Sequence, residues 1–493
     1  MDTKTEETSE TRRVAKAAIF ILFCVLLERY STAGISSILF LFFNQKIGFD
    51  VHESTAGYHT YECLLYLFPV IGGIIADSWL GRYRTMVCMS IIVAIGSLIV
   101  AVGVIDAFNL PIKVFSVIGL LVLTFGDACL VTLVPTFGAE QYKSTEVKSI
   151  DWFFSLFYIM YNCGSIVSRF ISPILREDVK CFGNDDCFPL AFGLPAILMS
   201  IVTVLIMISN RFSEAKQTQG TTVMNVLACI KHAIVMKFKL RKNPPAKNLH
   251  LLDYSEEKYG TELVRDTQII SKVIVLYLPI IIFWALFYQQ GSRWVYQATR
   301  MNGDLGFYTI KADQFNVVNP LFVIALIPVF EHILYPLLSK VAVTTALQKA
   351  TLGGVVGGVS FLVSAIVELQ LEDKYLHMTW LIPQYLLMAS AEVLVTVPLM
   401  NFSYSEAPES MKTILQALFF LSAGLGNLFV VIVAGTKFIE SQFYEFVIYA
   451  VLMFADIIVF GMLARRYKSS VQPNSEELIE NSKFNQESYQ TRL

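Results

Sequence analysis

The stretch GGIIADSWLGRYRT, residues 72–85, is a short polar turn between two long apolar runs. The run before it has its core at 57–76 and the run after it at 85–106. Each run is long enough to cross a bilayer as a helix, which needs roughly 20 apolar residues. Because lipid offers no hydrogen-bond partners to the backbone, spanning runs of this kind must be helical. This part of the chain therefore predicts two membrane-spanning helices joined by a turn at the membrane surface.

The same pattern continues along the chain on both sides of this turn. Of its 493 residues, 55% are hydrophobic and 16% are charged, whereas about a quarter of the residues of a soluble protein are charged. The composition therefore predicts an all-α polytopic membrane protein. We find about twelve runs of roughly 18–25 apolar residues, with approximate cores at 15–43, 57–76, 85–106, 112–134, 152–175, 189–209, 268–290, 315–338, 346–368, 380–400, 413–435 and 444–464.

A long polar connection divides these runs into two sets of six. Within it, NVLACIKHAIVMKF (225–238) has the apolar spacing of an amphipathic helix suited to the membrane surface. The polar end of the chain has no apolar periodicity and is expected to be disordered. The expected units are a cytoplasmic N-terminal segment at 1–13, a six-helix bundle at 14–209, a cytoplasmic linker at 210–267, a second six-helix bundle at 268–468 and a cytoplasmic tail at 469–493.

Lysine and arginine are concentrated on one side of the predicted membrane. They occur in the turn after the second run, in the connection after the fourth, throughout the linker and beyond the outermost runs at both ends. Cytoplasmic connections carry such an excess, so both termini and the linker are predicted to be cytoplasmic. With no clear sorting signal, the plasma membrane is favoured over an endolysosomal membrane. The ending TRL, at Leu493, fits the carboxyl terminus that PDZ-type domains bind, although a three-residue match often arises by chance.

The eight cysteines are mostly scattered in apolar runs, where a thiol behaves as a small apolar side chain. Cys181 and Cys187 differ, because they share a short loop on the predicted outer side. A disulfide closing that loop is expected in an oxidising compartment. No nucleotide-binding loop, metal cluster or nucleophile constellation stands out in the sequence, which disfavours an ATP-driven pump and an enzyme.

Several blocks of the sequence resemble proteins of known function. The turn at 72–85 is similar to the loop after the second helix of the major facilitator superfamily. There Gly73 would let the helix end pack closely, Asp77 would cap or pair, and Arg82 would meet lipid headgroups. Longer blocks resemble the proton-coupled oligopeptide transporters, a solute carrier 15-like family, and in particular its animal members. These blocks are ERYSTAG (28–34), YHTYECLLYLFPVIGGIIADSWLG (58–81), FFSLFYIMYNCGSI (153–166), CFPLAFGLPAILM (187–199), FWALFYQQGSRWVYQA (283–298) and FSYSEAPESMK (402–412).

This resemblance implies the major facilitator fold and uptake of di- and tripeptides driven by an inward proton gradient, with no cofactor. In the first helix, the family's Glu-Arg pair is matched by Glu28 and Arg29. Glu392 is the expected main proton carrier, followed by Glu28 and His59, and Lys272 stands at a basic position expected to act in gating. Substrate contacts are expected between the bundles from Arg29, Tyr66, Tyr158, Asn162, Trp284, Asn319 and Glu392.

Other positions depart from the family pattern. Ser36 and Val131 each stand where the family has a basic residue, whereas Glu62 and Asp127 add carboxyl groups within predicted spans. We therefore hypothesise that selectivity is altered, with less dependence on a substrate carboxylate and a preference for cationic substrates. The family's charged or tyrosine side chains are missing at six positions: Val25, Thr32, Ala33, Ser36, Val131 and Tyr288.

Two alternatives remain open beside peptide transport. One is a transporter of a non-peptide, cationic solute, and the other is a non-transporting nutrient sensor or scaffold that signals through the linker and the tail. The lost charges at Val25, Ser36 and Val131 favour the scaffold. Against it stands a set of polar side chains on several helices, which a scaffold does not need: Glu28, Arg29, Asn162, Asn319 and Glu392.

Overall fold

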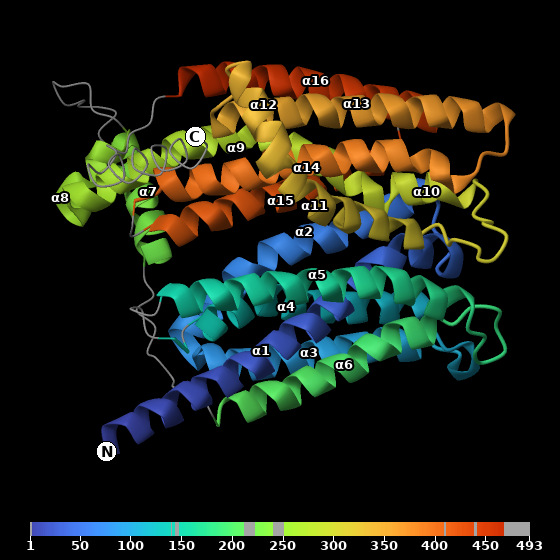
Figure 1. Ribbon diagram of the computed structural model, residues 1–493, viewed down its shortest axis with the longest axis horizontal. Helices are drawn as coiled ribbons and strands as arrows, with labels where there is room; N and C mark the ends of the chain where they lie inside the picture. Colours follow the sequence, from blue (N-terminus) through green and yellow to red (C-terminus); the bar gives the residue numbers. More distant parts are fainter. Residues whose placement is uncertain are drawn as a thin grey trace, which may run out of the picture.

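The chain folds into two helical bundles that lie side by side, one from each half of the sequence (Figure 1). The computed structural model describes residues 2–139, 141–142, 147–211, 222–239, 251–408, 411–437 and 441–467. The first bundle consists of α1 (Asp2–Leu41), α2 (Val51–Ile75), α3 (Arg82–Gly103), α4 (Ile112–Ala139), α5 (Val147–Glu177) and α6 (Phe188–Ser209). Helix α1 begins at Asp2, so the predicted N-terminal segment continues directly into the first span.

The second bundle follows the same plan but contains more interruptions. Helix α9 is followed at once by the short α10, and α11 and α12 are the two parts of one broken span. The helices are α9 (Thr261–Phe287), α10 (Arg293–Thr299), α11 (Val318–Val329), α12 (Tyr335–Lys340), α13 (Ala346–Asp373), α14 (Ile382–Glu406), α15 (Lys412–Gly435) and α16 (Gln442–Arg466).

Ten helical segments of the described chain are long and apolar enough to cross a membrane. Helices α2 and α5 do not belong to these ten, although they have the length of a span. With them, the described residues contain the twelve spans that the sequence predicts. Helices α2 and α5 carry several of the predicted site residues, among them His59, Tyr66 and Asn162.

The linker helices lie at one end of the molecule and the disulfide at the other. At one end, the linker end, lie α7 (Thr222–Lys239) and α8 (Glu256–Tyr259) (Figure 1). The predicted amphipathic segment lies within α7, and its Cys229 and Ala233 are buried against Leu252 and Val264. Part of its apolar face therefore packs on the protein itself. The predicted tail, with Leu493, lies outside the described residues.

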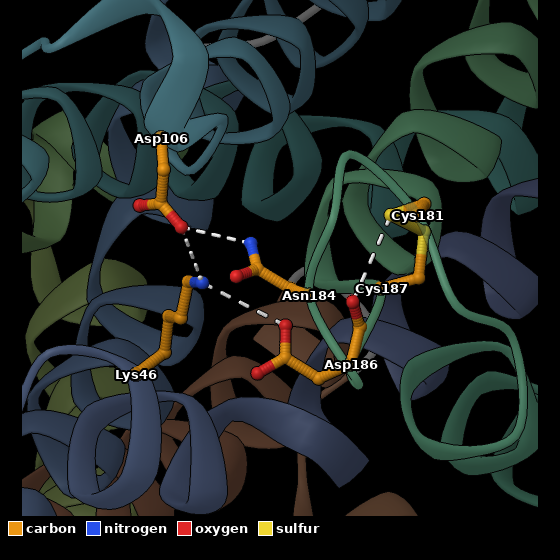
Figure 2. The surroundings of a disulfide bond; sticks show 6 residues. All are labelled: Lys46, Asp106, Cys181, Asn184, Asp186 and Cys187. Carbon is orange, nitrogen blue, oxygen red and sulfur yellow. Dashed lines mark hydrogen bonds and ion pairs between the residues drawn. A yellow bond between two sulfur atoms is a disulfide. The ribbon is translucent and has the colours of Figure 1, made fainter.

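The opposite end, the disulfide end, is held by a group of polar contacts (Figure 2). Cys181 and Cys187 form the disulfide that the sequence predicts. Lys46, after α1, lies 3.3 Å from a carboxylate oxygen of Asp106, which also accepts a 2.8 Å hydrogen bond from the Asn184 amide. The Asn184 amide and then the Lys46 ammonium keep the pKa of Asp106 below its usual value. Three connections of the first bundle are thus tied together.

Each bundle has its own apolar core. In the first, the Phe42 ring lies 4.8 Å from that of Phe192, measured between ring centroids. In the second, Trp294 lies 4.8 Å from Tyr385 in the same measure. The second core also includes Phe40 and Leu41 of α1, so the two bundles pack on each other as well as around cores of their own.

Contacts between the bundles gather toward the disulfide end. Helix α2 runs along α15, and Gly424 is close enough to Tyr66 that an added Cβ would meet the Tyr66 Cβ at 3.0 Å. Near the end of α5, Arg176 donates to both carboxylate oxygens of Asp313, at 2.9 and 3.1 Å. These contacts close the molecule on the disulfide side.

Candidate functional site

The first element of the site is the Glu28–Arg29 pair, in the middle of α1. The Arg29 guanidinium donates to both Glu28 carboxylate oxygens, at 2.8 and 2.5 Å, and both residues are buried. It also lies 3.3 Å from the Tyr161 hydroxyl and 4.7 Å from the centre of that ring, on α5. The forked geometry of two parallel bonds makes this a strong ion pair. Glu28 therefore takes up much of the hydrogen-bonding capacity of Arg29.

A second carboxylate, Asp127 on α4, joins this pair through Thr32. The Thr32 hydroxyl oxygen lies 2.9 and 2.7 Å from the two Asp127 oxygens and 3.4 Å from a Glu28 carboxylate oxygen. A hydroxyl has one proton to donate, so it cannot satisfy all of these acceptors at once. Asp127 thus lies with Glu28, and the group holds two carboxyl groups and one guanidinium.

The polar residues of α2 separate into two groups. Glu62 is buried in the first bundle, where it accepts a 2.5 Å hydrogen bond from Ser36. His59, also buried, faces the other bundle, with Nδ1 2.7 Å from the Asn427 amide oxygen and Nε2 3.0 Å from the Ser292 hydroxyl. Because both imidazole nitrogens are engaged across the boundary, His59 ties α2 to the second bundle.

Aromatic residues from both bundles meet next to this boundary. The hydroxyls of Tyr66 and Tyr288 are hydrogen-bonded to each other. Trp284 is buried beside Tyr288, with ring centroids 6.1 Å apart, and its indole nitrogen has no partner in the described structure. Tyr288, which stands where the family has an acidic residue, therefore bonds a tyrosine across the boundary.

Glu392 and Asn319 form the polar site of the second bundle. The Asn319 amide on α11 donates a 2.8 Å hydrogen bond to a carboxylate oxygen of Glu392 on α14. The Asn319 amide oxygen is buried and without a partner among the described residues. The structure brings these two predicted residues together as one unit.

Helix α5 carries the remaining predicted contacts. Tyr158 is 47% exposed, and the Asn162 amide donates to the Tyr158 backbone oxygen at 2.8 Å. Arg169, seven positions after Asn162 on the same helix, is not among the residues that the family pattern predicts. A charged residue in an apolar run is itself a signal, and this one could have been found from the sequence.

The predicted gating residues lie apart from this site. Asp77 and Arg82 belong to the connection from α2 to α3, and the side chain of Asp77 lies outside the described part of the structure. Lys272 is exposed in the first half of α9, toward the linker end.

Two six-helix bundles with buried charges near their boundary are the architecture of the major facilitator fold. The chain belongs to the POT family, whose model, described as "PTR2: POT family", matches residues 83–442. Its proteins are membrane transporters.

Individual relatives agree with this assignment. The chain is 38% identical over 359 residues to "Peptide transporter family 1" of Drosophila melanogaster, covering 73% of this chain and 48% of the relative. It is 37% identical over 357 residues to "Solute carrier family 15 member 2" of Homo sapiens, covering 72% and 49%. The chain thus spans about half the length of the curated relatives it matches. Among solved structures, the POT family transporter PepTSo has the same fold, with a TM-score of 0.76 at 23% identity, over 92% of this chain and 99% of that one.

Proposed function

We propose that this chain is a secondary active transporter that takes up small peptides together with protons. The observation that carries the proposal is the placement of ionisable groups in both bundles: Glu28 with Arg29 in one, Glu392 with Asn319 in the other. Ionisable residues inside spans mark transport pathways, and two-bundle transporters bind substrate between their halves. The name of the fruit fly relative, "Peptide transporter family 1", supports a peptide as the substrate.

The arrangement of the bundles supports alternating access. The Arg176–Asp313 ion pair and the two bonds of His59 hold the bundles together toward the disulfide end. We place the linker end in the cytoplasm, with both termini, because lysine and arginine are concentrated there, and we place the protein in the plasma membrane. In this orientation the structure is closed toward the outside, and opening that side would break the contacts of His59 and Arg176.

Uptake by the purified protein in proteoliposomes tests the proposal. With an acidic exterior and a neutral interior, labelled alanyl-alanine is expected to accumulate inside. A difference of one pH unit supports about tenfold accumulation for each proton carried. A protonophore should abolish the accumulation and leave equilibration. Folded protein that neither accumulates nor equilibrates any di- or tripeptide would favour the sensor or scaffold, and uptake of cationic non-peptides alone would favour the other alternative.

Charge balance supports a preference for cationic peptides. The polar groups near the boundary include the carboxyl groups of Glu28, Glu62, Asp127 and Glu392, against the guanidinium groups of Arg29 and Arg169. Glu62 accepts its hydrogen bond from the neutral Ser36 hydroxyl, at a position where the family pattern has a basic residue. We therefore assign the preference chiefly to Glu62.

Competition between dipeptides tests this assignment. Alanyl-lysine is expected to inhibit uptake at roughly one tenth of the concentration that alanyl-glutamate requires, a difference of about 1.4 kcal/mol. Glu62→Gln should remove most of this difference, because the amide keeps the shape of the side chain and loses its charge. Asp106→Asn is the matched control, since Asp106 lies in the loop beyond α3, and it should leave the difference unchanged. An unaltered preference in Glu62→Gln would refute the role of Glu62.

A further inference from the structure

Arg169 stands out because it has no counter-ion in the described part of the chain, unlike the other arginines buried in the bundles. Arg29 is paired with Glu28, Arg176 with Asp313, and Arg293 with Glu445 at 3.0 Å. No ion pair joins Arg169 to a carboxylate among the described residues. A guanidinium in a membrane protein's interior is costly unless it is paired, so an unpaired one calls for a functional explanation.

The hydrogen bonding of Arg169 is equally incomplete. One terminal nitrogen donates to the backbone oxygen of Asn316, in the second bundle, across a long 3.4 Å. Its Nε is buried and has no partner in the described structure. Guanidinium carries five N–H donors in a planar fork that matches a carboxylate. The side chain is half-buried, so a ligand carboxylate would supply both the missing charge and the missing acceptors.

The position of Arg169 on α5 indicates how a bound peptide would lie along this helix. Tyr158, Asn162, Ser165 and Arg169 are spaced by four, three and four residues, which places them along one face of the helix. Asn162 and Arg169 are about 10 Å apart along the helix axis, close to the length of an extended tripeptide, at about 3.3–3.6 Å per residue. Since side chains lean toward the start of a helix, the long Arg169 side chain can also reach a dipeptide.

We propose that Arg169 binds the terminal carboxylate of the transported peptide. This inference rests on the proposed function, and it revises the hypothesis of a weakened dependence on the carboxylate, which counted Arg29 as the remaining cation. Arg29 is already occupied by Glu28, whereas Arg169 is available. Arg169 lies on α5 of the first bundle and contacts the backbone of Asn316 in the second, so it stands at the boundary where substrate would bind.

A purely structural role is the competing explanation: the bond to Asn316 would hold the bundles together and nothing more. The two explanations differ in what they predict for ligands. A purely structural contact affects the binding of every substrate alike. A residue that binds the carboxylate distinguishes alanyl-alanine from its C-terminal amide. The informative quantity is therefore the ratio of the two affinities, measured both by binding to purified protein and by inhibition of uptake.

The experiment compares wild type with Arg169→Gln, Arg169→Lys and the control Lys180→Gln, whose exposed ammonium pairs with Asp185 in the disulfide loop. Arg169→Gln is expected to lower the affinity for alanyl-alanine, relative to that for its amide, by about ten- to a hundredfold. This is the effect of losing a charge-assisted hydrogen bond. For Arg169→Lys, the ratio of the two affinities should fall between those of wild type and Arg169→Gln, because lysine keeps the charge but loses the planar fork of donors. Lys180→Gln should match wild type, and elution as a single peak on size exclusion checks that each variant is folded.

If Arg169→Gln binds both ligands more weakly by the same factor, or if the ratio of the two affinities is unchanged, Arg169 does not bind the carboxylate. The proposed transport would remain intact. A wild-type protein that takes up no peptide, yet binds alanyl-alanine in an Arg169-dependent way, overturns the transport and leaves the anchor. If Arg169→Gln does not fold, Arg169→Lys takes its place. The proposed anchor then requires that Arg169→Lys prefer alanyl-alanine over its amide less strongly than wild type does.

Discussion

Glu392→Gln is expected to abolish the stimulation of peptide uptake by external acid. The glutamine side chain keeps the size of Glu392 and can still accept the hydrogen bond from Asn319, but it cannot carry a proton. Binding should therefore survive while coupling is lost. Uptake driven by a pH gradient is expected to fall at least about tenfold, the accumulation that one proton supports per pH unit, whereas exchange of labelled for unlabelled peptide continues.

Measuring both acid-driven uptake and peptide exchange distinguishes a loss of proton coupling from a loss of folding. Exchange without accumulation shows a folded carrier that has lost its proton site. Glu406→Gln is the matched control, because Glu406 is on the same helix, near its linker end, and accepts a 2.9 Å hydrogen bond from Tyr467. It should retain acid stimulation. Undiminished stimulation in Glu392→Gln would exclude Glu392 from the proton pathway and leave Glu28 as the next candidate.

The spans could be predicted from the sequence because lipid imposes one simple requirement, a long apolar helix. The requirement is weakest where a helix faces protein on several sides, and α2 and α5 are the two spans that fall short of it. They carry His59, Glu62, Asn162 and Arg169. Part of the site thus lies on these two helices, whereas Glu28, Arg29 and Glu392 lie on spans that meet the requirement. The packing of α7 on Leu252 and Val264 could not be predicted, because it depends on a tertiary contact.

The family pattern indicates candidate positions for the site but not which of them are partners. Asn319 and Glu392, which the pattern names separately, are hydrogen-bonded to each other. Asp127 is predicted only as a carboxyl group within a span, and the structure shows that its neighbours, Thr32 and Glu28, are on another helix. The family pattern does not predict Arg169, because the pattern contains no charged residue at this position. Its significance lies in a missing counter-ion, which only a three-dimensional arrangement reveals.

Arg29→Leu is expected to be the most destabilising single change in the first bundle. It leaves the carboxylate of Glu28 buried without its counter-ion, beside Asp127. Removing one partner of a buried ion pair costs about 3–5 kcal/mol of folding free energy. Thermal unfolding in detergent should therefore show a large drop in apparent Tm, together with loss of uptake. An unchanged Tm would mean that the pair contributes little to folding.

The triple change Glu28→Leu, Arg29→Leu and Asp127→Asn decides what these charges are for. Replacing a buried ion pair by apolar residues is often neutral for stability, and the amide that replaces the Asp127 carboxylate can still accept from the Thr32 hydroxyl, so the apparent Tm should return toward that of wild type. Uptake should not return, because we assign the charges to transport. If the triple variant regains both stability and acid-driven uptake, the Glu28–Arg29 pair is structural only. Recovery of stability without uptake would mean that these costly charges are retained in the membrane for the work of transport.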